Sequence, residues 1–274
     1  MLFRKADMVF IIGKIFKKLL TFLCICDKFS IHTKCIWRCR MINSIVNRHG
    51  RLTPYTETEI NIIRSAVKLF LENGYTKTTF KMIEADSGVK IGNITYYFHS
   101  KEDLFKVLVE ELMESHISVI DDVYNDVKDN VYAYAMEVTA QIALCENDKN
   151  AWDLYYSAYS LPHTFDHIKL WAEEKNYNLF KDDLPGWSEH DFRNIEVVAS
   201  GIEFAALKTL CDRSFTLDKK VSVILDSLLM LYEVSKEKRT EVIDKILKTD
   251  YEKMAKDMFE SFVKRLDGVD KPKE

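Results

Sequence analysis

The stretch that decides the fold runs from Gly74 to Leu104 and reads GYTKTTFKMIEADSGVKIGNITYYFHSKEDL. Its first half predicts a short helix that is capped by Thr78-Thr79 and ends before the turn at Ser87-Gly88. A second short helix is predicted over residues 89–98. Two short helices joined by a turn that contains glycine are typical of a helix-turn-helix, whose second helix enters the major groove of DNA.

Longer helices are predicted on both sides of this motif. Upstream, Thr56 and Glu59 form a T-x-x-E capping box, and Asn73-Gly74 ends the helix that it opens. The apolar residues between them fall at helical spacing and are Ile60, Ile63, Val67, Phe70 and Leu71. Downstream, Ser100 and Asp103 form a second cap, which opens a long helix. The pattern therefore predicts a three-helix DNA-binding domain that continues into a further helix.

The second short helix divides into a packing side and a side that is available to DNA. Gly88 supplies a positive φ between the two short helices. The packing residues are Val89, Ile94 and Phe98, at a spacing suited to contact with Ile63, Phe70 and Ile83. The polar or amphipathic residues left outside this core are Lys90, Asn93, Thr95, Tyr96 and Tyr97. We expect these five side chains to face DNA.

Several residues of this region together resemble one known family. They are Gly74-Tyr75, Thr78-Thr79, Ile83, Gly88-Val89, Gly92, Tyr97-Phe98 and Ser100-Lys101-Glu102-Asp103-Leu104. In this combination the segment resembles the TetR family of bacterial regulators. The resemblance covers roughly residues 56–112, about a quarter of the chain. It implies a homodimer that binds double-stranded operator DNA through the helix-turn-helix and an unknown small-molecule effector through a helical domain behind it.

The resemblance also implies roles for individual residues. Thr79 is expected to cap the short helix at a phosphate, and Lys81 to reach DNA. The helix at 90–97 is expected to read the major groove, while Tyr97 touches the backbone. Lys101 is expected to bind phosphate at the start of the next helix.

Two residues depart from the family pattern. Glu84 stands where the family usually has alanine, and Thr95 stands where it most often has tyrosine within the recognition helix. A threonine offers a small hydroxyl and a methyl group, which suits a thymine methyl or a phosphate. The operator sequence is therefore not carried over from the family.

The composition of the chain favours an all-α fold in more than one domain. A length of 274 residues exceeds the usual size of one domain, and 8 Gly and 4 Pro against 47% hydrophobic residues favour long helices. Further helices are predicted near 121–145, 150–161, 164–180, 189–211, 217–232, 238–248 and 250–266. We divide the chain into an extension (1–50), the helix-turn-helix domain (51–100) and a helical ligand-binding and dimerisation domain (101–274).

The charge is distributed unevenly along the chain. The formal net charge of −4 argues against a protein that coats nucleic acid in general. Residues 113–274 hold 32 acidic and 21 basic residues, so the acidic excess lies behind the DNA-binding domain. An effector bound there is expected to be neutral or cationic and not phosphorylated.

An aromatic-rich region follows residue 150 and is the candidate effector pocket. Its predicted ligand-binding residues are Trp152, Tyr155, Tyr156, Tyr159 and Trp171. Tyrosine hydroxyls inside an apolar cavity need partners, which suits an apolar or planar small molecule. The alternative is that most of these side chains are ordinary core residues.

Two helices of the C-terminal half carry apolar stripes that predict the dimer interface. The first stripe consists of Phe192, Ile195, Val198, Ala199, Ile202, Ala206 and Leu210, and the second of Val221, Ile224, Leu228 and Leu231. Two such helices from each chain make a four-helix interface. Charged replacements at Ile202 and Leu228 are expected to yield monomers.

The first 40 residues differ in composition from the rest. They hold nine basic residues, two acidic residues and the cysteines Cys24, Cys26, Cys35 and Cys39. With His32, these suggest zinc, but the C-x-C and C-x3-C spacing lacks regular C-x2-C knuckles. We interpret the segment as a dispensable basic extension or as the product of an upstream start codon, with Met41 as the alternative start. Lysines interrupt its apolar run, so no membrane span is expected, and the protein is expected to be cytoplasmic.

The sequence offers little for catalysis, and no enzyme activity, metal or cofactor is expected. His163 and His167 lie four residues apart, but the glutamate of an H-E-x-x-H site is absent and Pro162 precedes the first histidine. We predict a repressor that a small molecule releases from a palindromic operator. The alternatives are a constitutive helical DNA-binding protein without an effector and, less favoured, a helical metalloenzyme that uses the two histidines.

Overall fold

The computed structural model describes residues 45–46, 52–53 and 55–268. The chain separates into two compact units, residues 1–60 and residues 61–274. The extension before Met41, with Cys24, Cys26, His32, Cys35 and Cys39, lies outside the described residues. The predictions of a zinc site and of a dispensable extension therefore stay predictions.

The described part of the first unit holds a minimal strand pair and the start of a helix. Strands β1 (Ile45–Val46) and β2 (Leu52–Thr53) are antiparallel, with Ile45 opposite Thr53. The predicted capping box is present, because Glu59 N–H donates to Thr56 Oγ1 at 3.3 Å and Thr56 N–H donates to Glu59 Oε2 at 2.7 Å. Helix α3 (Glu57–Asn73) begins at this cap.

The second unit begins with the helix-turn-helix that the sequence predicts. Helix α4 (Phe80–Ser87) is capped by Thr79, and α5 (Ile91–Tyr97) follows the turn at Gly88, where φ is +71°. Gly74 ends α3 at a φ of +81°. Both glycines thus adopt the left-handed conformation that a side chain disfavours. The fold class is all-α, as predicted.

The core of the DNA-binding domain differs from the predicted core at two positions. Ile94, Phe98 and Ile83 are buried as expected, and so is Phe70 of α3. Ile62 is buried where Ile63 was predicted, and Ile63 and Val89 are only half-buried. The apolar spacing alone leaves the buried face of α3 uncertain by one residue, because two neighbouring isoleucines fit the helical period almost equally well.

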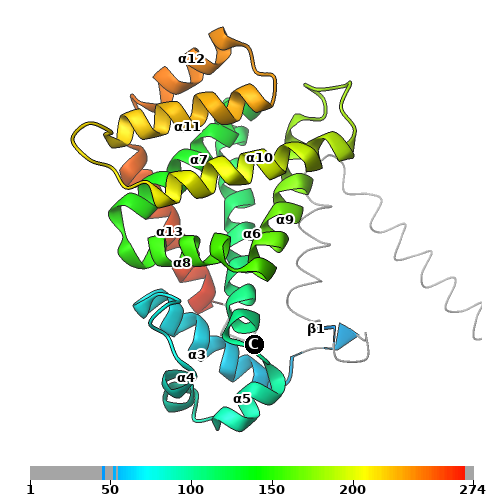
Figure 1. Cartoon of the computed structure of the whole chain (residues 1–274), viewed down its shortest axis with the longest axis vertical. Coiled ribbons are helices and arrows are strands. Elements are labelled where there is room, and N and C mark those ends of the chain that lie inside the picture. Colours follow the sequence, from blue (N-terminus) through cyan, green and yellow to red (C-terminus); the bar gives the residue numbers. More distant parts are fainter. Residues whose placement is uncertain (1–44, 47–51, 54, 269–274) are drawn as a thin grey trace, which may run out of the picture. The chain divides into compact units, whose positions relative to one another are not determined.

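Helix α6 (Lys101–Val127) links the DNA-binding domain to the helices behind it, and Figure 1 shows α3, α4 and α5 gathered at its lower end. The next helix, α7 (Asn130–Asn147), is separate from α6. Lys128 has a φ of +53°, and the Asp129 carboxylate accepts a hydrogen bond from Tyr132 N–H at 3.0 Å. The predicted helix over 121–145 is therefore wrong, since it runs across a break that only the backbone conformation reveals.

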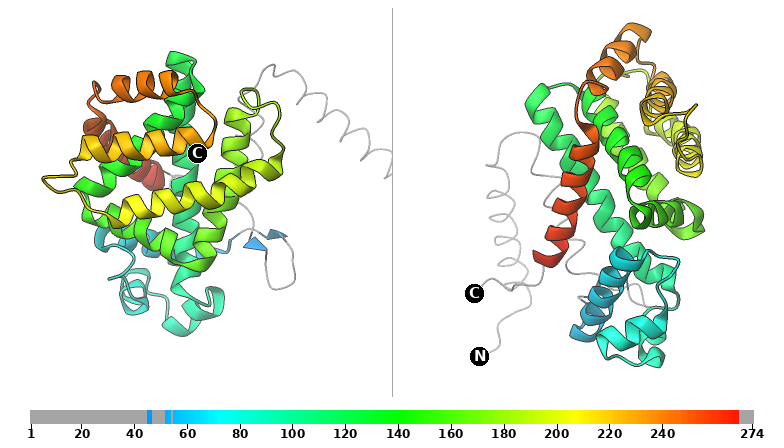
Figure 2. Two further views of the ribbon diagram at one scale, coloured as in Figure 1. Left: turned by 45° about the horizontal axis from the view of Figure 1, so that its top comes forward. Right: turned by 90° about the vertical axis from the view of Figure 1, so that its left-hand side faces the viewer.

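Six further helices complete the helical domain. They are α8 (Lys149–Ser160), α9 (Pro162–Phe180), α10 (Glu189–Lys208), α11 (Leu217–Leu231), α12 (Lys236–Ile246) and α13 (Tyr251–Gly268). Helix α7 is buried along most of its length and packs against α6, α8, α11 and α13. Figure 2 shows α13 on one side of this domain, with α10 and α11 on the other. Within the described residues, no helix is both long and apolar enough to cross a membrane.

The two predicted interface stripes are only partly exposed. Phe192, Ala199 and Ala206 of α10 are buried, and so are Val221 and Leu228 of α11. The exposed apolar positions of these helices are Val197 and Val198 on α10 and Val223 and Met230 on α11, and Leu210 is exposed just after α10 ends. Much of each predicted stripe is therefore the face that packs inside the chain, so a charge at the fully buried Leu228 would disrupt the fold itself.

Candidate functional site

Five of the eight predicted DNA-binding residues are exposed around α4 and α5, whereas Thr95, Tyr97 and Lys101 are half-buried. Thr79, Lys81, Lys90 and Asn93 are exposed, and Tyr96 is 65% exposed. The local reason is the turn at Gly88, which turns the polar face of α5 outward while Ile94 and Phe98 anchor its other face. This surface has the cationic, amide and aromatic groups that DNA recognition uses.

The two departures from the family pattern change the chemistry of this surface. The Thr95 hydroxyl donates to the backbone oxygen of Ile91 at 3.0 Å, and the residue is half-buried. Glu84 carries a carboxylate whose Oε1 lies 3.3 Å from the Lys90 ammonium. One cation of the recognition surface is thus paired with an acid of the neighbouring helix.

Lys101 lies in the joint between the DNA-binding domain and α6. Its ammonium donates to the backbone oxygens of Tyr75 at 2.7 Å and Thr78 at 3.0 Å, and it lies 3.9 Å from the centre of the Tyr75 ring. Burial lowers the pKa of Lys101. The resemblance predicts a phosphate contact for this residue, and the structure adds a structural role to that prediction.

A second joint connects the loop after α3 to helix α8. The Asp153 carboxylate accepts hydrogen bonds from Thr76 N–H at 2.9 Å and from the Thr76 hydroxyl at 2.5 Å. The Asn150 side chain donates to the backbone oxygen of Glu72 at 2.9 Å, at the carboxyl end of α3. A Cβ on Gly74 would lie 2.6 Å from Asp153 Oδ2. The close approach places α8 directly against the loop that follows α3 in the DNA-binding domain.

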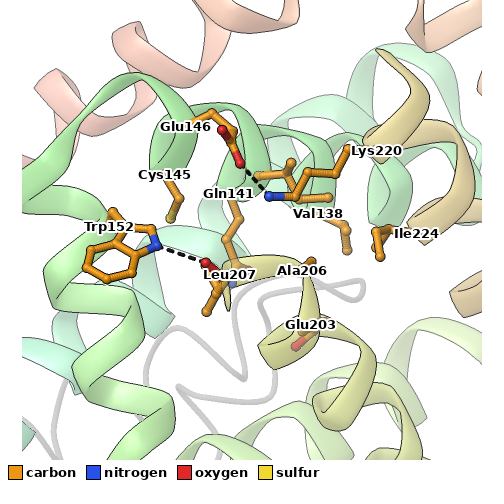
Figure 3. A pocket seen from close by; sticks show the side chains of 11 residues that line it. Val138, Gln141, Cys145, Glu146, Trp152, Glu203, Ala206, Leu207, Lys220 and Ile224 are labelled. Carbon is orange, nitrogen blue, oxygen red and sulfur yellow. Dashed lines mark hydrogen bonds and ion pairs between the residues drawn. The ribbon is translucent and has the colours of Figure 1, made fainter. Parts of the chain in front are cut away.

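The helical domain contains a narrow cavity between α7, α8, α10 and α11 (Figure 3). The residues that line it are Val138, Gln141, Ile142, Cys145, Glu146, Trp152, Glu203, Ala206, Leu207, Lys220 and Ile224. The cavity has room for about one water molecule, because the volume open to the centre of a water-sized sphere is about 10 Å³. A larger ligand would have to displace side chains of the wall.

Two interactions close the wall of this cavity. Lys220 pairs with Glu146 and also donates to the backbone oxygen of Thr209 at 2.8 Å. The Trp152 indole N–H donates to the backbone oxygen of Leu207 at 2.8 Å (Figure 3). Trp152 lies between Asn150 and Asp153 on α8, so the helix that forms the cavity wall is also the helix that holds the DNA-binding domain.

Glu203 is the charged group of the cavity without a basic partner. Its Oε2 accepts a hydrogen bond from the Tyr159 hydroxyl at 2.5 Å. No lysine or arginine among the described residues forms an ion pair with it; Lys175 pairs with Glu137 instead. Burial raises the pKa of Glu203 to about 7, despite the opposing effects of Tyr159 and Lys175.

A buried ionic network lies deeper in the domain. The Glu137 carboxylate lies 2.5 Å from His116 Nδ1 and 3.1 Å from Lys175 Nζ, while His116 Nε2 lies 2.7 Å from the Tyr155 hydroxyl. Burial alone would raise the pKa of Glu137, but Lys175 and His116 lower it to about 2. This carboxylate is therefore ionised and is used for internal pairing.

The five predicted ligand-binding residues are placed differently from one another. Trp152 lines the cavity, and Tyr156 stacks on it with ring centres 4.9 Å apart. Tyr159 reaches the cavity through Glu203. Tyr155 and Trp171 instead contact His116 in the buried network. Whether any of these residues binds a ligand stays a prediction.

The predicted ligand-binding residues did not include the polar and charged side chains of the cavity. Glu203, Gln141 and Lys220 line the cavity but come from helices distant in sequence from the aromatic cluster. One signal was available, because acidic residues at 137, 196 and 203 interrupt otherwise apolar helix faces. Acids at such positions usually indicate a buried polar site.

The two histidines considered for metal binding have other contacts. The His163 backbone N–H donates to Glu102 Oε1 at 3.0 Å, and the imidazole Nε2 of His167 lies 3.4 Å from Glu110 Oε1. Among the residues that the structure describes, no cluster of three or more histidine, cysteine or acidic side chains is placed to hold a metal ion.

Comparisons with known proteins identify the DNA-binding region. Residues 62–108 match the model of bacterial regulatory proteins of the tetR family. Over 94 residues the chain is 31% identical to the fatty acid metabolism regulator protein of Bacillus subtilis (strain 168), covering 33% of this chain and 47% of that protein. Over 64 residues it is 34% identical to the probable HTH-type transcriptional regulator YttP of the same organism, covering 23% and 31%. The chain thus matches less than half of either relative.

Solved structures show the same fold over a longer stretch. The crystal structure of RolR with the ligand resorcinol superimposes with a TM-score of 0.56 at 16% identity and covers 68% of this chain and 93% of RolR. RolR without ligand gives a TM-score of 0.52 at 14% identity and covers 68% and 96%. The similarity therefore includes the helical domain as well as the helix-turn-helix.

Proposed function

Because this chain belongs to the TetR family of bacterial regulators, we propose that it is a homodimeric repressor that a small molecule releases from a palindromic operator. The family consists of regulators and not of enzymes. The observation that carries the proposal is the position of α8, which bears Trp152 in the cavity wall and Asp153 in the joint to the DNA-binding domain. A ligand that enters the cavity and displaces this helix would also displace the DNA-binding domain.

The exposed groups of α5 support recognition in the major groove. Asn93 offers an amide that can pair with adenine, and Tyr96 offers an aromatic edge. Lys81 and Lys90 supply charge toward phosphates, which contributes affinity without sequence information. The two DNA-binding domains of one dimer would dock in successive major grooves about 34 to 36 Å apart. The operator is therefore expected to be a pseudo-palindrome with half-sites about one turn apart.

The exposed apolar side of α10 and α11 supports dimerisation. Val197 and Val198 of α10 face solvent in the single chain, as do Leu210 after that helix and Val223 and Met230 of α11. Gly201 and Ala205, also exposed, add small residues that permit close helix packing. The same face on a second copy would complete a two-fold interface.

A ligand-bound structure with the same fold also supports a small-molecule effector. RolR was crystallised with resorcinol, a small planar phenol. The cavity of this chain has an aromatic wall at Trp152 and a narrow interior, which suits a small aromatic molecule. A coupling of about 1 to 3 kcal/mol between effector and DNA would change operator affinity by about 5- to 150-fold.

The direct test is operator selection followed by affinity measurement. Purified protein is used to enrich double-stranded DNA from a random pool, and fluorescence anisotropy then measures binding to the selected sequence and its point variants. Asn93→Ala is expected to change the ranking of operator variants, with a loss of about 1 to 3 kcal/mol at one base pair. Asn178→Ala, an exposed asparagine on α9, serves as the control. Failure to enrich any sequence would contradict the proposal.

A further inference from the structure

We infer that the effector is a small protonated amine with an apolar, aromatic body, and that its ammonium group binds at Glu203. This inference rests on the proposed function, because it names the chemical class of ligand for the same cavity. Two features of the helical domain point to a cation: the carboxylates in its interior and the composition of the cavity wall.

The interior of the domain carries an excess of carboxylates. Glu137, Glu196 and Glu203 all lie within electrostatic reach of one another and of Tyr134. Lys175 is the ammonium that faces them, and it is bonded to Glu137. Lys175 and His116 are the basic groups beside these three carboxylates, so all three cannot be ionised without leaving one without a cationic partner. Burial accordingly raises the pKa of Glu196 and of Glu203, and a bound cation would stabilise the ionised form of Glu203.

Two polar atoms in this region lack a hydrogen-bond partner among the described residues. They are the Tyr134 hydroxyl and Asn176 Oδ1, both buried. The Asn176 amide nitrogen donates to Glu196 Oε1 at 2.6 Å and to the Tyr232 hydroxyl at 2.9 Å, which leaves its oxygen as an acceptor. Buried polar atoms without partners are uncommon in native proteins. Neither residue lines the cavity, so these atoms belong to the interior around Glu196 and are not part of the proposed ammonium site.

Among charged ligands, the lining of the cavity favours an organic cation over an anion or a metal ion. The second acid of its lining, Glu146, is neutralised by Lys220, so the net charge of the lining comes from Glu203. Figure 3 shows the Glu146–Lys220 pair on the side of the cavity away from Glu203. The remaining wall is mostly apolar, with Val138, Ile142 and Leu207 among its residues. An anion would be repelled by Glu203, and a metal ion would find too few ligands among the described side chains.

Binding of such a cation is expected to be linked to the release of a proton. Burial keeps the pKa of Glu203 at about 7, so part of the population holds a proton at neutral pH. The groups that face Glu203 are the Tyr159 hydroxyl on α8, Glu137 on α7, Lys175 on α9 and Glu196 on α10; Lys220 on α11 lies across the cavity. An ammonium binds the ionised carboxylate, so its affinity should rise with pH until Glu203 is fully ionised.

The experiment compares two probes of similar shape in the full-length protein. Isothermal titration calorimetry measures the binding of 2-phenylethylamine, a cation, and of 2-phenylethanol, its neutral counterpart. At pH 8 the amine is expected to bind at least about tenfold more tightly, and its affinity is expected to fall about tenfold between pH 8 and pH 6. Titrations in buffers of different ionisation enthalpy should report the release of about one proton at pH 6.

Variants assign the effect to Glu203. Glu203→Gln keeps a group that can accept the Tyr159 hydrogen bond, and it is expected to remove the preference for the amine and its pH dependence while 2-phenylethanol binds as before. Glu189→Gln makes the same change at an exposed site of the same helix and should alter neither. Tyr159→Phe removes a hydrogen bond that lowers the pKa of Glu203, so it should shift the pH midpoint upward.

Two outcomes would overturn the inference. One is equal or weaker binding of the amine, including no binding of either probe, and the other is an amine preference that survives Glu203→Gln. The operator assay is separate. A protein that binds operator DNA but shows no amine preference refutes the cation site and leaves the regulator intact. A protein that prefers the amine but selects no operator refutes the proposed function and leaves the cation site.

Discussion

Glu84 shows how one side chain can tune a DNA-binding surface. Its carboxylate lies 3.3 Å from the Lys90 ammonium at the start of the recognition helix. The Lys90 side chain is largely exposed, so the pair contributes little to folding. Its effect should instead appear in DNA binding, where a paired cation is less available to phosphate.

Glu84→Ala is expected to strengthen DNA binding. The change frees Lys90 and removes a negative charge next to the phosphates, so affinity for non-specific duplex DNA should rise by roughly three- to tenfold in about 0.1 M salt. The plot of log affinity against log salt concentration should steepen by about one unit. Asp86→Ala is the control, because Asp86 is an acid of the same helix that pairs with Lys68 of α3. Equal effects of both variants would indicate general charge and not the release of Lys90.

Glu203 should also make stability depend on pH. Its folded-state pKa, about 7, lies above the ordinary carboxyl value of 4.5, because burial disfavours the charged form. The folded state then binds this proton more tightly than the unfolded state does. The resulting stabilisation is present at low pH and is lost as pH rises from about 4.5 to about 7.

Glu203→Gln is expected to stabilise the protein at alkaline pH, because glutamine carries no charge to desolvate. The gain in the free energy of unfolding should reach up to about 3 kcal/mol at pH 8 and should shrink toward zero near pH 4.5. Urea denaturation at several pH values measures it, with Glu189→Gln for comparison. A gain that does not vary with pH would contradict the assigned pKa.

At the level of secondary-structure elements, α8 connects the cavity to the DNA-binding domain. Trp152 lies in the cavity wall, while Asn150 and Asp153 of the same turns hold the chain around Thr76. The long α6 provides a second route, because Lys101 at its start also holds this loop. An effector signal that uses α8 can pass through the Asp153 carboxylate and through the Asn150 amide.

Asp153→Ala is expected to uncouple effector from DNA. The variant loses both hydrogen bonds from Thr76 and keeps only the Asn150 bond to Glu72, so displacement of α8 should move the DNA-binding domain much less. The ratio of operator affinity without and with 2-phenylethylamine should fall toward one, while calorimetry should show unchanged amine binding. Asp166→Ala, at an exposed acid of α9, is the control. An unchanged ratio in the Asp153 variant would assign the signal to Asn150 or to α6 and not to Asp153.

The elements that the sequence predicts best are those with strong local signals. The caps at Thr56, Thr79 and Ser100 and the left-handed glycines at 74 and 88 depend on residues close in sequence, and the structure confirms them. The break at Lys128 was missed because the apolar pattern continues across it. The cavity was predicted only in part, since Trp152 belongs to a visible aromatic cluster whereas Glu203 becomes important only through helices brought together by folding.

At the level of the whole molecule, the uncovered apolar faces of α10 and α11 are the proposed dimer interface. The sequence pattern identified these helices but not their free faces, because periodicity shows that a helix has an apolar side and not which partner covers it. Tertiary packing buries Phe192, Val221 and Leu228 inside the chain. Val197 and Val223, at 65% and 54% exposure, and Met230, at 57%, remain uncovered.

Charges on this uncovered face should separate the dimer. Val197→Glu combined with Val223→Glu is expected to give monomers at micromolar concentration in sedimentation velocity, because a carboxylate buried in a two-fold apolar interface has no partner. The circular dichroism spectrum should stay unchanged, since both positions are exposed in the single chain. Leu170→Glu, at a position of α9 that is 61% exposed, tests whether any exposed apolar residue has this effect.

The same double variant also tests how the operator is read. A dimer binds the palindrome with two DNA-binding domains, whereas a monomer binds one half-site. The affinity of the double variant for the full palindrome should therefore fall to its affinity for an isolated half-site. The affinity for a single half-site should stay within about twofold of the unaltered protein, because α4 and α5 are untouched. A monomer that still prefers the full palindrome would assemble on DNA through another surface, and a variant that stays dimeric in solution would exclude the α10–α11 face as the interface.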